Sequence, residues 1–439
     1  MHDLLNQLKS RFNGLSRRSL ILGSGGIATL GLLALSRPAK EGGPIEPYFE
    51  KLGAAVSEKG LARPTLVVDL ARLDQNIEVM KSHLRPDMGY RIVAKSLPSL
   101  PLIRHVMAAA DTNKLMLFHQ PFVNLVAEKE PSADVLLGKP MPVGAAARFY
   151  DELGPTSFDS STQLQWLIDT PERLAEYQDL ANARGQAMRI NLELDVGLHR
   201  GGLTDPATLK PILETIDADP LLTFSGFMGY DPHLASVPDL MGWQGRAIET
   251  SMDIYKAFVD AAAEHYGDDW KPKELTLNTA GSPTYQLHKE TMHANEVAVG
   301  SALVKPTHFD VSTLSDHVPA SFITTPVVKT AERTDIPGLE ALTGPTRLWD
   351  RNTAQTFFIY GGNWLAEPVS PPGLRTNGVF GRSSNQEMLN GSDMIDLAAN
   401  DTVVLRPTQS EFVFLQFGDI QVFDGGKITE SWPVFTQGA

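Results

Sequence analysis

Short apolar runs alternate with helical patterns through the first two thirds of the chain, and this alternation constrains the fold more than any other feature. Runs of this kind, separated by amphipathic stretches, are typical of parallel β/α units. Eight runs can be counted, at residues 90–94, 115–118, 135–138, 157–159, 189–196, 224–230, 275–278 and 297–303. Eight strands with intervening helices predict a closed (β/α)8 barrel.

The intervening segments agree with this prediction, and the pattern changes near Pro306. Apolar residues recur at helical spacing in residues 100–110, 205–216 and 247–266. Beyond Pro306 come short extended runs separated by turns, at residues 320–329, 356–360, 401–405, 411–417 and 420–423. We therefore predict an α/β fold class, a TIM barrel followed by a C-terminal β domain, which the early strand at residues 65–69 is expected to join.

The predicted domain organisation has four parts. Residues 1–40 form a signal segment, 41–60 a linker helix, 61–310 the barrel and 311–439 the β domain. A chain of 439 residues has room for two folded units and a terminal extension.

The charge and the absence of cysteine exclude several functions. The formal charge is −14, and the body of the chain has no Lys/Arg cluster for a phosphate backbone, so nucleic acid is not an expected partner. Zero cysteines exclude disulfides, thiolate metal sites and a cysteine nucleophile.

The pattern of residues 1–40 predicts an export signal. Arg17 and Arg18 precede a Gly-rich apolar run at residues 21–35, which is shorter than the roughly 20 residues that a stable membrane anchor needs. Adjacent arginines before such a run resemble a twin-arginine signal, which predicts a periplasmic protein. Small residues at 34–36 provide an imperfect cleavage site, so an uncleaved tether stays open, but no other membrane contact is expected.

Lys95 stands directly after the first apolar run, where a barrel places its reactive groups. Active sites of barrels lie at the C-terminal ends of the strands. An amine at the end of an apolar strand is partly desolvated, which favours the nucleophilic neutral form. This position makes Lys95 a candidate Schiff-base lysine.

Five motifs in chain order resemble the pyridoxal-phosphate family that contains alanine racemase, D-threonine aldolase and D-serine dehydratase. They are Pro64-Thr65-Leu66-Val67-Val68-Asp69-Leu70 with Lys95, Glu193-Leu194-Asp195-Val196-Gly197-Leu198-His199-Arg200-Gly201-Gly202, Gly226-Phe227-Met228-Gly229-Tyr230-Asp231-Pro232-His233, Asn278-Thr279-Ala280-Gly281-Ser282-Pro283-Thr284-Tyr285, and Val299-Gly300-Ser301. The last two follow the seventh and eighth predicted strands, where small residues and exposed N–H groups can surround a phosphate. The aldolase and dehydratase branch is the most similar.

The resemblance implies pyridoxal 5'-phosphate as cofactor and an amino acid as substrate. Its implied catalytic residues are Lys95, Arg200, His233 and Glu411. The implied cofactor-binding residues are Lys95, Arg200, Tyr230, Asn278, Gly281, Ser282, Thr284, Gly300 and Ser301. A homodimer is also implied, since the family closes the barrel mouth with a second subunit. The second proton donor stays open among Arg91, Tyr285 and a residue of a partner subunit.

The sequence departs from this branch near its metal site and its ring-nitrogen site. Gln409 and Glu411 stand where the branch has a histidine and a second metal ligand, and an amide is a poor replacement for imidazole in a zinc site. We therefore expect no required metal, with these two residues as the positions that would hold one. Alanine racemases place an arginine where this chain has Ala298.

These residues lead to three functional hypotheses. The first is a lyase that cleaves or dehydrates a D-amino acid or β-hydroxy amino acid, as D-threonine aldolase or D-serine dehydratase do. The second is a periplasmic amino-acid racemase, and the third is a non-catalytic protein that binds pyridoxal phosphate.

Overall fold

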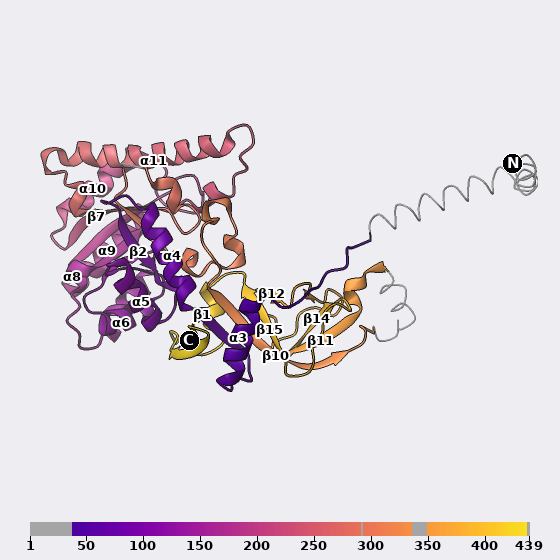
Figure 1. Ribbon diagram of the computed structural model, residues 1–439. Coiled ribbons are helices and arrows are strands. Elements are labelled where there is room, and N and C mark those ends of the chain that lie inside the picture. Colours follow the sequence, from indigo (N-terminus) through magenta and orange to yellow (C-terminus); the bar gives the residue numbers. More distant parts are fainter. Residues whose placement is uncertain (1–36, 291–292, 336–348, 437–439) are drawn as a thin grey trace, which may run out of the picture.

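The computed structural model describes residues 37–290, 293–335 and 349–436, and its central feature is a closed parallel barrel (Figure 1). The eight barrel strands follow one another around the barrel in chain order. They are β2 (Gly89–Val93), β3 (Lys114–Leu117), β4 (Asp134–Leu137), β5 (Leu164–Ile168), β6 (Met188–Leu194), β7 (Leu222–Gly229), β8 (Thr276–Thr279) and β9 (Glu296–Val299). The predicted fold class is confirmed.

Helices surround the barrel, and the longer ones present an apolar stripe to the outer faces of the strands. They are α4 (Leu70–His83), α5 (Leu100–Ala110), α6 (Gln120–Lys129), α7 (Val143–Glu152), α8 (Ser160–Gln163), α9 (Pro171–Arg184), α10 (Leu209–Ala218), α11 (Trp243–Tyr266) and the single turn α12 (Ser301–Val304). In α10, for example, Leu209, Ile212, Leu213 and Ile216 are buried at helical spacing. The segments with amphipathic patterns thus form the helical layer that covers the barrel.

The fourth predicted strand was wrong. Residues 157–159 form a loop that caps α8, and the strand is β5 at Leu164–Ile168. Gln165 interrupts the apolar run of β5, yet it is fully buried inside the barrel, where its side-chain amide donates to Thr276 Oγ1 at 2.9 Å. Because the partners of this polar residue come from other strands, a pattern of hydrophobic residues alone does not reveal the strand.

The second domain is built on a largely antiparallel, nine-stranded sheet. Its strands are β1 (Thr65–Asp69), β10 (Ser321–Ala331), β11 (Gln355–Tyr360), β12 (Ala366–Ser370), β13 (Arg375–Thr376), β14 (Gln386–Gly391), β15 (Thr402–Pro407), β16 (Ile420–Asp424) and β17 (Lys427–Trp432). The early strand β1 lies between β10 and β16, as the sequence predicted for residues 65–69. The chain therefore begins this sheet before it enters the barrel and completes it afterwards.

Two short elements outside the barrel bear on the predictions. The helix expected within 41–60 is α3 (Pro47–Glu58), whose residues Leu52, Ala55 and Val56 pack on the second sheet. The extended run expected at 411–417 was wrong, because a helical turn, α14 (Glu411–Phe414), stands there. The signal segment predicted at 1–40 lies almost entirely outside the described residues.

The two domains share one continuous apolar core, and the C-terminal segment returns to the barrel. Phe435 donates its backbone N–H to the Pro98 carbonyl at 2.8 Å, and its ring lies 4.6 Å from that of Phe122. In Figure 1 the C-terminal end lies beside the barrel helices. No helix among the described residues is long and apolar enough to cross a bilayer.

Candidate active site

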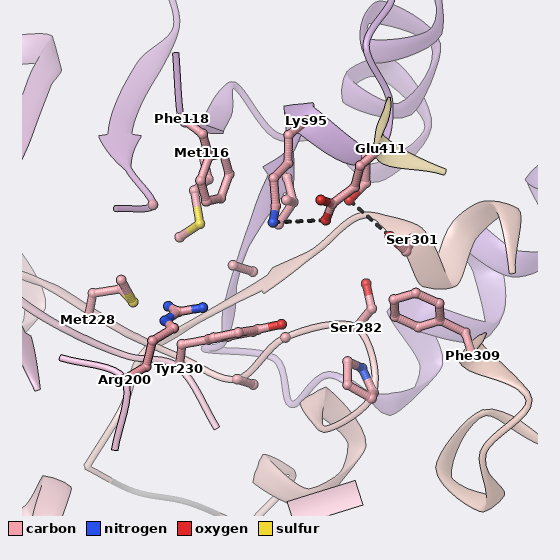
Figure 2. A pocket seen from close by; sticks show the side chains of 17 residues that line it. Lys95, Met116, Phe118, Arg200, Met228, Tyr230, Ser282, Ser301, Phe309 and Glu411 are labelled. Atoms are coloured by element: carbon pink, nitrogen blue, oxygen red, sulfur yellow. Dashed lines mark hydrogen bonds and ion pairs between the residues drawn. The ribbon is translucent and has the colours of Figure 1, made fainter. Parts of the chain in front are cut away.

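A cavity of about 530 Å³, including its open mouth, lies at the C-terminal ends of the barrel strands (Figure 2). Both domains line it, since Glu411 of the second domain joins residues that follow seven barrel strands or lie within them. The lining residues are Val93, Lys95, Ser96, Met116, Phe118, Gly138, Arg200, Met228, Tyr230, Ala280, Gly281, Ser282, Pro283, Ala298, Ser301, Phe309 and Glu411. This is the end of a barrel at which catalytic groups gather.

Lys95 reaches into the cavity from a 3₁₀ turn, η1 (Ala94–Ser96), that directly follows β2. Its Nζ lies 2.8 Å from Glu411 Oε1 and 4.6 Å from the centre of the Phe118 ring. About a third of the lysine side chain is exposed. The amine is therefore held between a carboxylate and an aromatic face, and a small molecule in the cavity can reach it.

Glu411 is the first residue of α14, which packs against η1. The helical turn, rather than the predicted strand, aims its carboxylate at Lys95. Gln409, the other candidate metal position, is partly buried and does not line the cavity. Among the described residues no group of three or more His, Asp or Glu is arranged to hold a metal ion.

Arg200 and Tyr230 face Lys95 from the opposite wall in Figure 2. The Arg200 guanidinium lies 4.9 Å from the centre of the Tyr230 ring, and its Nη2 is 3.6 Å from Glu193 Oε1. Burial raises the pKa of Tyr230 above its ordinary value, Arg200 opposes this rise, and Glu411 adds to it. The Tyr230 hydroxyl is therefore protonated at neutral pH and can donate a hydrogen bond.

The loops after β8 and β9 approach the cavity through glycines that have no room for a side chain. A Cβ on Gly281 would lie 2.5 Å from Cε2 of Tyr230, and one on Gly300 would lie 2.7 Å from the carbonyl oxygen of Val93. Ser282 Oγ accepts from the backbone N–H groups of Gly300 and Ala302, both at 3.1 Å. The two loops are thus tied together at the cavity wall.

Four predicted site residues are not among those that line this cavity, namely Gly300, Asn278, Thr284 and His233. Asn278 is buried inside the barrel, where its amide donates to Glu296 Oε1 at 2.9 Å. Thr284 Oγ1 donates to Asp231 Oδ1 at 2.6 Å and accepts from the Gly281 N–H at 3.1 Å, so it supports the glycine loop from behind. His233 has a buried Nδ1 without a hydrogen-bond partner in the described part of the chain.

The two proton-donor candidates within this chain are also turned away from the cavity. Arg91 is fully buried and bonds Glu296 through Nε at 2.5 Å and Asp134 Oδ1 through Nη1 at 2.9 Å. The Tyr285 hydroxyl lies 3.3 Å from His317 Nε2, and burial raises its pKa. Neither residue is among those that line the cavity.

The sequence analysis did not predict the apolar residues that line the cavity. Met116 and Phe118 belong to or follow β3, so their place at a strand end could have indicated them. Met228 lies within β7 and alternates with Phe227. Phe309 comes from a 3₁₀ turn after the barrel, and no sequence signal marks it.

The comparisons with known proteins agree with this geometry. The family model of the alanine racemase N-terminal domain matches residues 68–307, more than half of the chain, and the chain belongs to this family. Members of the family use pyridoxal phosphate and act on small amino-acid substrates. No curated protein matches the chain significantly.

Solved structures with the same fold include a D-threonine aldolase, a dehydratase and a racemase. The D-threonine aldolase of Filomicrobium marinum has 15% identity and a TM-score of 0.64, with 84% of this chain and 94% of that chain covered. The D-threo-3-hydroxyaspartate dehydratase of Delftia sp. HT23 has 14% identity and a TM-score of 0.64, with 85% of this chain and 98% of that chain covered. The alanine racemase of Bacillus anthracis has 14% identity and a TM-score of 0.63, with 84% of this chain and 97% of that chain covered. At such identities the likeness shows the fold of a fold-type III pyridoxal-phosphate enzyme.

Proposed function

We propose that this protein is a pyridoxal-phosphate-dependent lyase that acts on a D-amino acid bearing a β-hydroxyl group. The cavity fits the cofactor, because an accessible amine stands opposite a cationic and aromatic wall. A Cβ on Gly281 would lie 2.5 Å from Cε2 of Tyr230, so a glycine is what lets this loop approach the cavity wall, and Ser282 and Ser301 supply small polar side chains to the lining. Lys95 would hold the cofactor covalently, and the two loops would surround its phosphate.

The contact between Lys95 and Glu411 is the observation that carries the proposal. Bound pyridoxal phosphate would supply an electron sink for negative charge at the substrate Cα. Lys95 Nζ is the group that would take or return a proton at Cα. Glu411, 2.8 Å away, would handle the proton of a hydroxyl on the neighbouring Cβ. The two neighbouring groups, Lys95 and Glu411, would thus act on the two neighbouring substrate atoms Cα and Cβ.

Glu411 would serve either reaction of a β-hydroxy amino acid. In a dehydration its carboxyl group would deliver a proton to the departing hydroxyl, and in a retro-aldol cleavage its carboxylate would accept the hydroxyl proton.

A racemase is the second candidate, and Tyr230 is the residue that favours it. Racemisation needs proton-transfer groups on both faces of Cα, and the Tyr230 hydroxyl points into the cavity from the wall opposite Lys95 (Figure 2). Ala298 lines the cavity where alanine racemases have an arginine. This uncharged residue, together with Glu411 beside Lys95, makes the lyase the better supported proposal.

The test is an absorbance spectrum and a substrate panel on the full-length protein and its Lys95→Ala variant, with Lys210→Ala, an exposed lysine on α10, as matched control. We expect an absorbance band of the lysine-bound cofactor that is lost only in Lys95→Ala. Turnover of D-threonine, D-serine or D-3-hydroxyaspartate to a carbonyl product would support the lyase. Conversion of one enantiomer into the other without carbonyl release would establish the racemase. A cofactor band with no conversion of any amino acid would contradict both.

A further inference from the structure

Three buried serine hydroxyls meet at the junction of the two domains. Ser301 Oγ lies 2.9 Å from Ser96 Oγ and 3.1 Å from Ser410 Oγ. The exposed fractions of Ser96, Ser301 and Ser410 are 2%, 2% and 0%. Figure 2 shows the hydrogen bond between Ser301 and Ser96 as a dashed line beside Glu411. These hydroxyls, called the serine bridge below, therefore join three separate segments of chain away from solvent.

Each serine of the bridge is adjacent in sequence to a residue of the candidate active site. Ser96 follows Lys95 in the turn η1, and Ser301 follows Gly300 after β9. Ser410 precedes Glu411, and its carbonyl accepts the Phe414 N–H at 3.1 Å as α14 begins. A shift of one serine thus moves a neighbouring functional residue.

The bridge is better suited than the ion pair to fix the position of Glu411. The side chains of Lys95 and Glu411 are 37% and 41% exposed, and ion pairs exposed to solvent contribute only about 0–1 kcal/mol. A buried hydroxyl that loses its partner incurs a desolvation penalty instead. The ion pair therefore contributes little to holding α14 in place, whereas the bridge ties Ser410, the residue before Glu411, to Ser301 of the barrel.

We infer that Ser410 and Ser301 are positioning residues that hold Glu411 of the second domain beside Lys95. This inference rests on the proposed function, because it assigns Glu411 the proton transfer whose geometry the bridge secures. Neither serine touches the reacting atoms through this role. Each acts through Glu411, and its effect must therefore disappear when Glu411 has already lost its carboxylate.

A double-mutant cycle on the cofactor-loaded protein tests this dependence. We expect Ser410→Ala to lower kcat about 5- to 10-fold with a change in KM of less than about twofold, because it misplaces a proton-transfer group rather than a binding group. The double variant Ser410→Ala/Glu411→Gln should be within about twofold of Glu411→Gln alone. Multiplicative losses in the double variant would overturn the inference.

Hydrogen exchange of the cofactor-free protein gives a readout that does not depend on turnover. Amides of residues 411–415 should exchange several-fold faster in Ser410→Ala and Ser301→Ala than in the wild type. Ser321→Ala is the matched control, since Ser321 is a fully buried serine of β10 whose Oγ donates to the Val304 carbonyl at 3.3 Å rather than to any residue of α14. Unchanged exchange at 411–415 would refute the bridge. If Ser410→Ala does not fold, Ser96→Ala carries both tests from the barrel side, and Ser301→Ala carries the exchange test alone, because Ser301 also belongs to the proposed cofactor site.

The two proposals fail in different ways. Absence of the lysine-bound cofactor band, or of any carbonyl product, would remove the proposed function while the exchange result still stands. Normal turnover in Ser410→Ala with a strong defect in Glu411→Gln would remove only the positioning role of the bridge.

Discussion

Lys95 Nζ and Glu411 Oε1 lie 2.8 Å apart, although one residue follows the first barrel strand and the other belongs to the second domain. The carboxylate beside the active-site lysine therefore comes from the part of the second domain that follows the barrel in the chain. Four of the predictions below concern this site and its supporting residues, and the fifth concerns export.

Glu411→Gln should lower turnover about 100-fold, because an amide cannot exchange a proton with a substrate hydroxyl. The cofactor band should remain, since Lys95 is untouched. Steady-state kinetics on the preferred substrate measures the change, with Glu249→Gln, an exposed position on α11, as control. Equal activities of the Glu411→Gln variant and the wild type would exclude Glu411 from proton transfer.

Gly281→Ala should raise the dissociation constant of the cofactor at least about tenfold. The new Cβ would lie 2.5 Å from the Tyr230 ring, and overpacking of this kind costs roughly 1–3 kcal/mol. A titration of the apoprotein with pyridoxal phosphate, followed by absorbance, measures the constant. Gly144→Ala meets nothing within 4 Å and is the control, and equal affinities of the two variants would contradict the assignment of the loop.

Glu296→Gln should destabilise the protein at neutral pH by about 3 kcal/mol, because the buried Arg91 loses one of its two carboxylate partners and keeps only Asp134. Burial opposes ionisation of Glu296, but Arg91 and Lys114 outweigh burial and lower its pKa to about 2, against an ordinary value of 4.5. A carboxyl group with a lowered folded-state pKa contributes stability above its unfolded pKa and loses it as the pH falls toward the folded one.

The stability difference between the wild type and Glu296→Gln should therefore shrink as the pH falls from about 4.5 toward 2. Urea unfolding at a series of pH values measures it, and comparison of the two proteins cancels the titration of the other carboxyl groups. A difference independent of pH in this window would show that the charge of Glu296 is not what stabilises the barrel interior.

Chelation should leave the activity unchanged, since Gln409 lies outside the cavity lining and Glu411 contacts Lys95. Turnover before and after dialysis against EDTA is the measurement. Loss of activity in EDTA with recovery in manganese or magnesium would make Glu411 a metal ligand instead.

Export by the twin-arginine route is the fifth prediction, and homodimerisation remains a prediction beside it. Replacement of Arg17 and Arg18 by lysine should leave the protein in the cytoplasm, because this route reads the arginine pair. Cell fractionation of the producing bacterium measures it. Unchanged delivery to the periplasm would contradict the signal assignment.

Several features of the site were readable in the sequence because they are local. Lys95 follows an apolar run, and Gly281 and Gly300 follow the seventh and eighth, so their chain positions place them at the barrel mouth. Asn278 shows the limit of such reasoning. It lies one residue before the end of β8, where the strand alternation turns its side chain into the barrel toward Glu296.

The sequence by itself determined the barrel class, the second sheet and the strand-end lysine, since periodicity and strand order depend on neighbours along the chain. Only the tertiary structure decided which carboxylate meets Lys95, that Gln165 belongs inside a strand, and that Ser96, Ser301 and Ser410 meet. These contacts join segments that are far apart in the chain. Their partners are fixed by closure of the barrel and by docking of the second domain, and no local pattern encodes either.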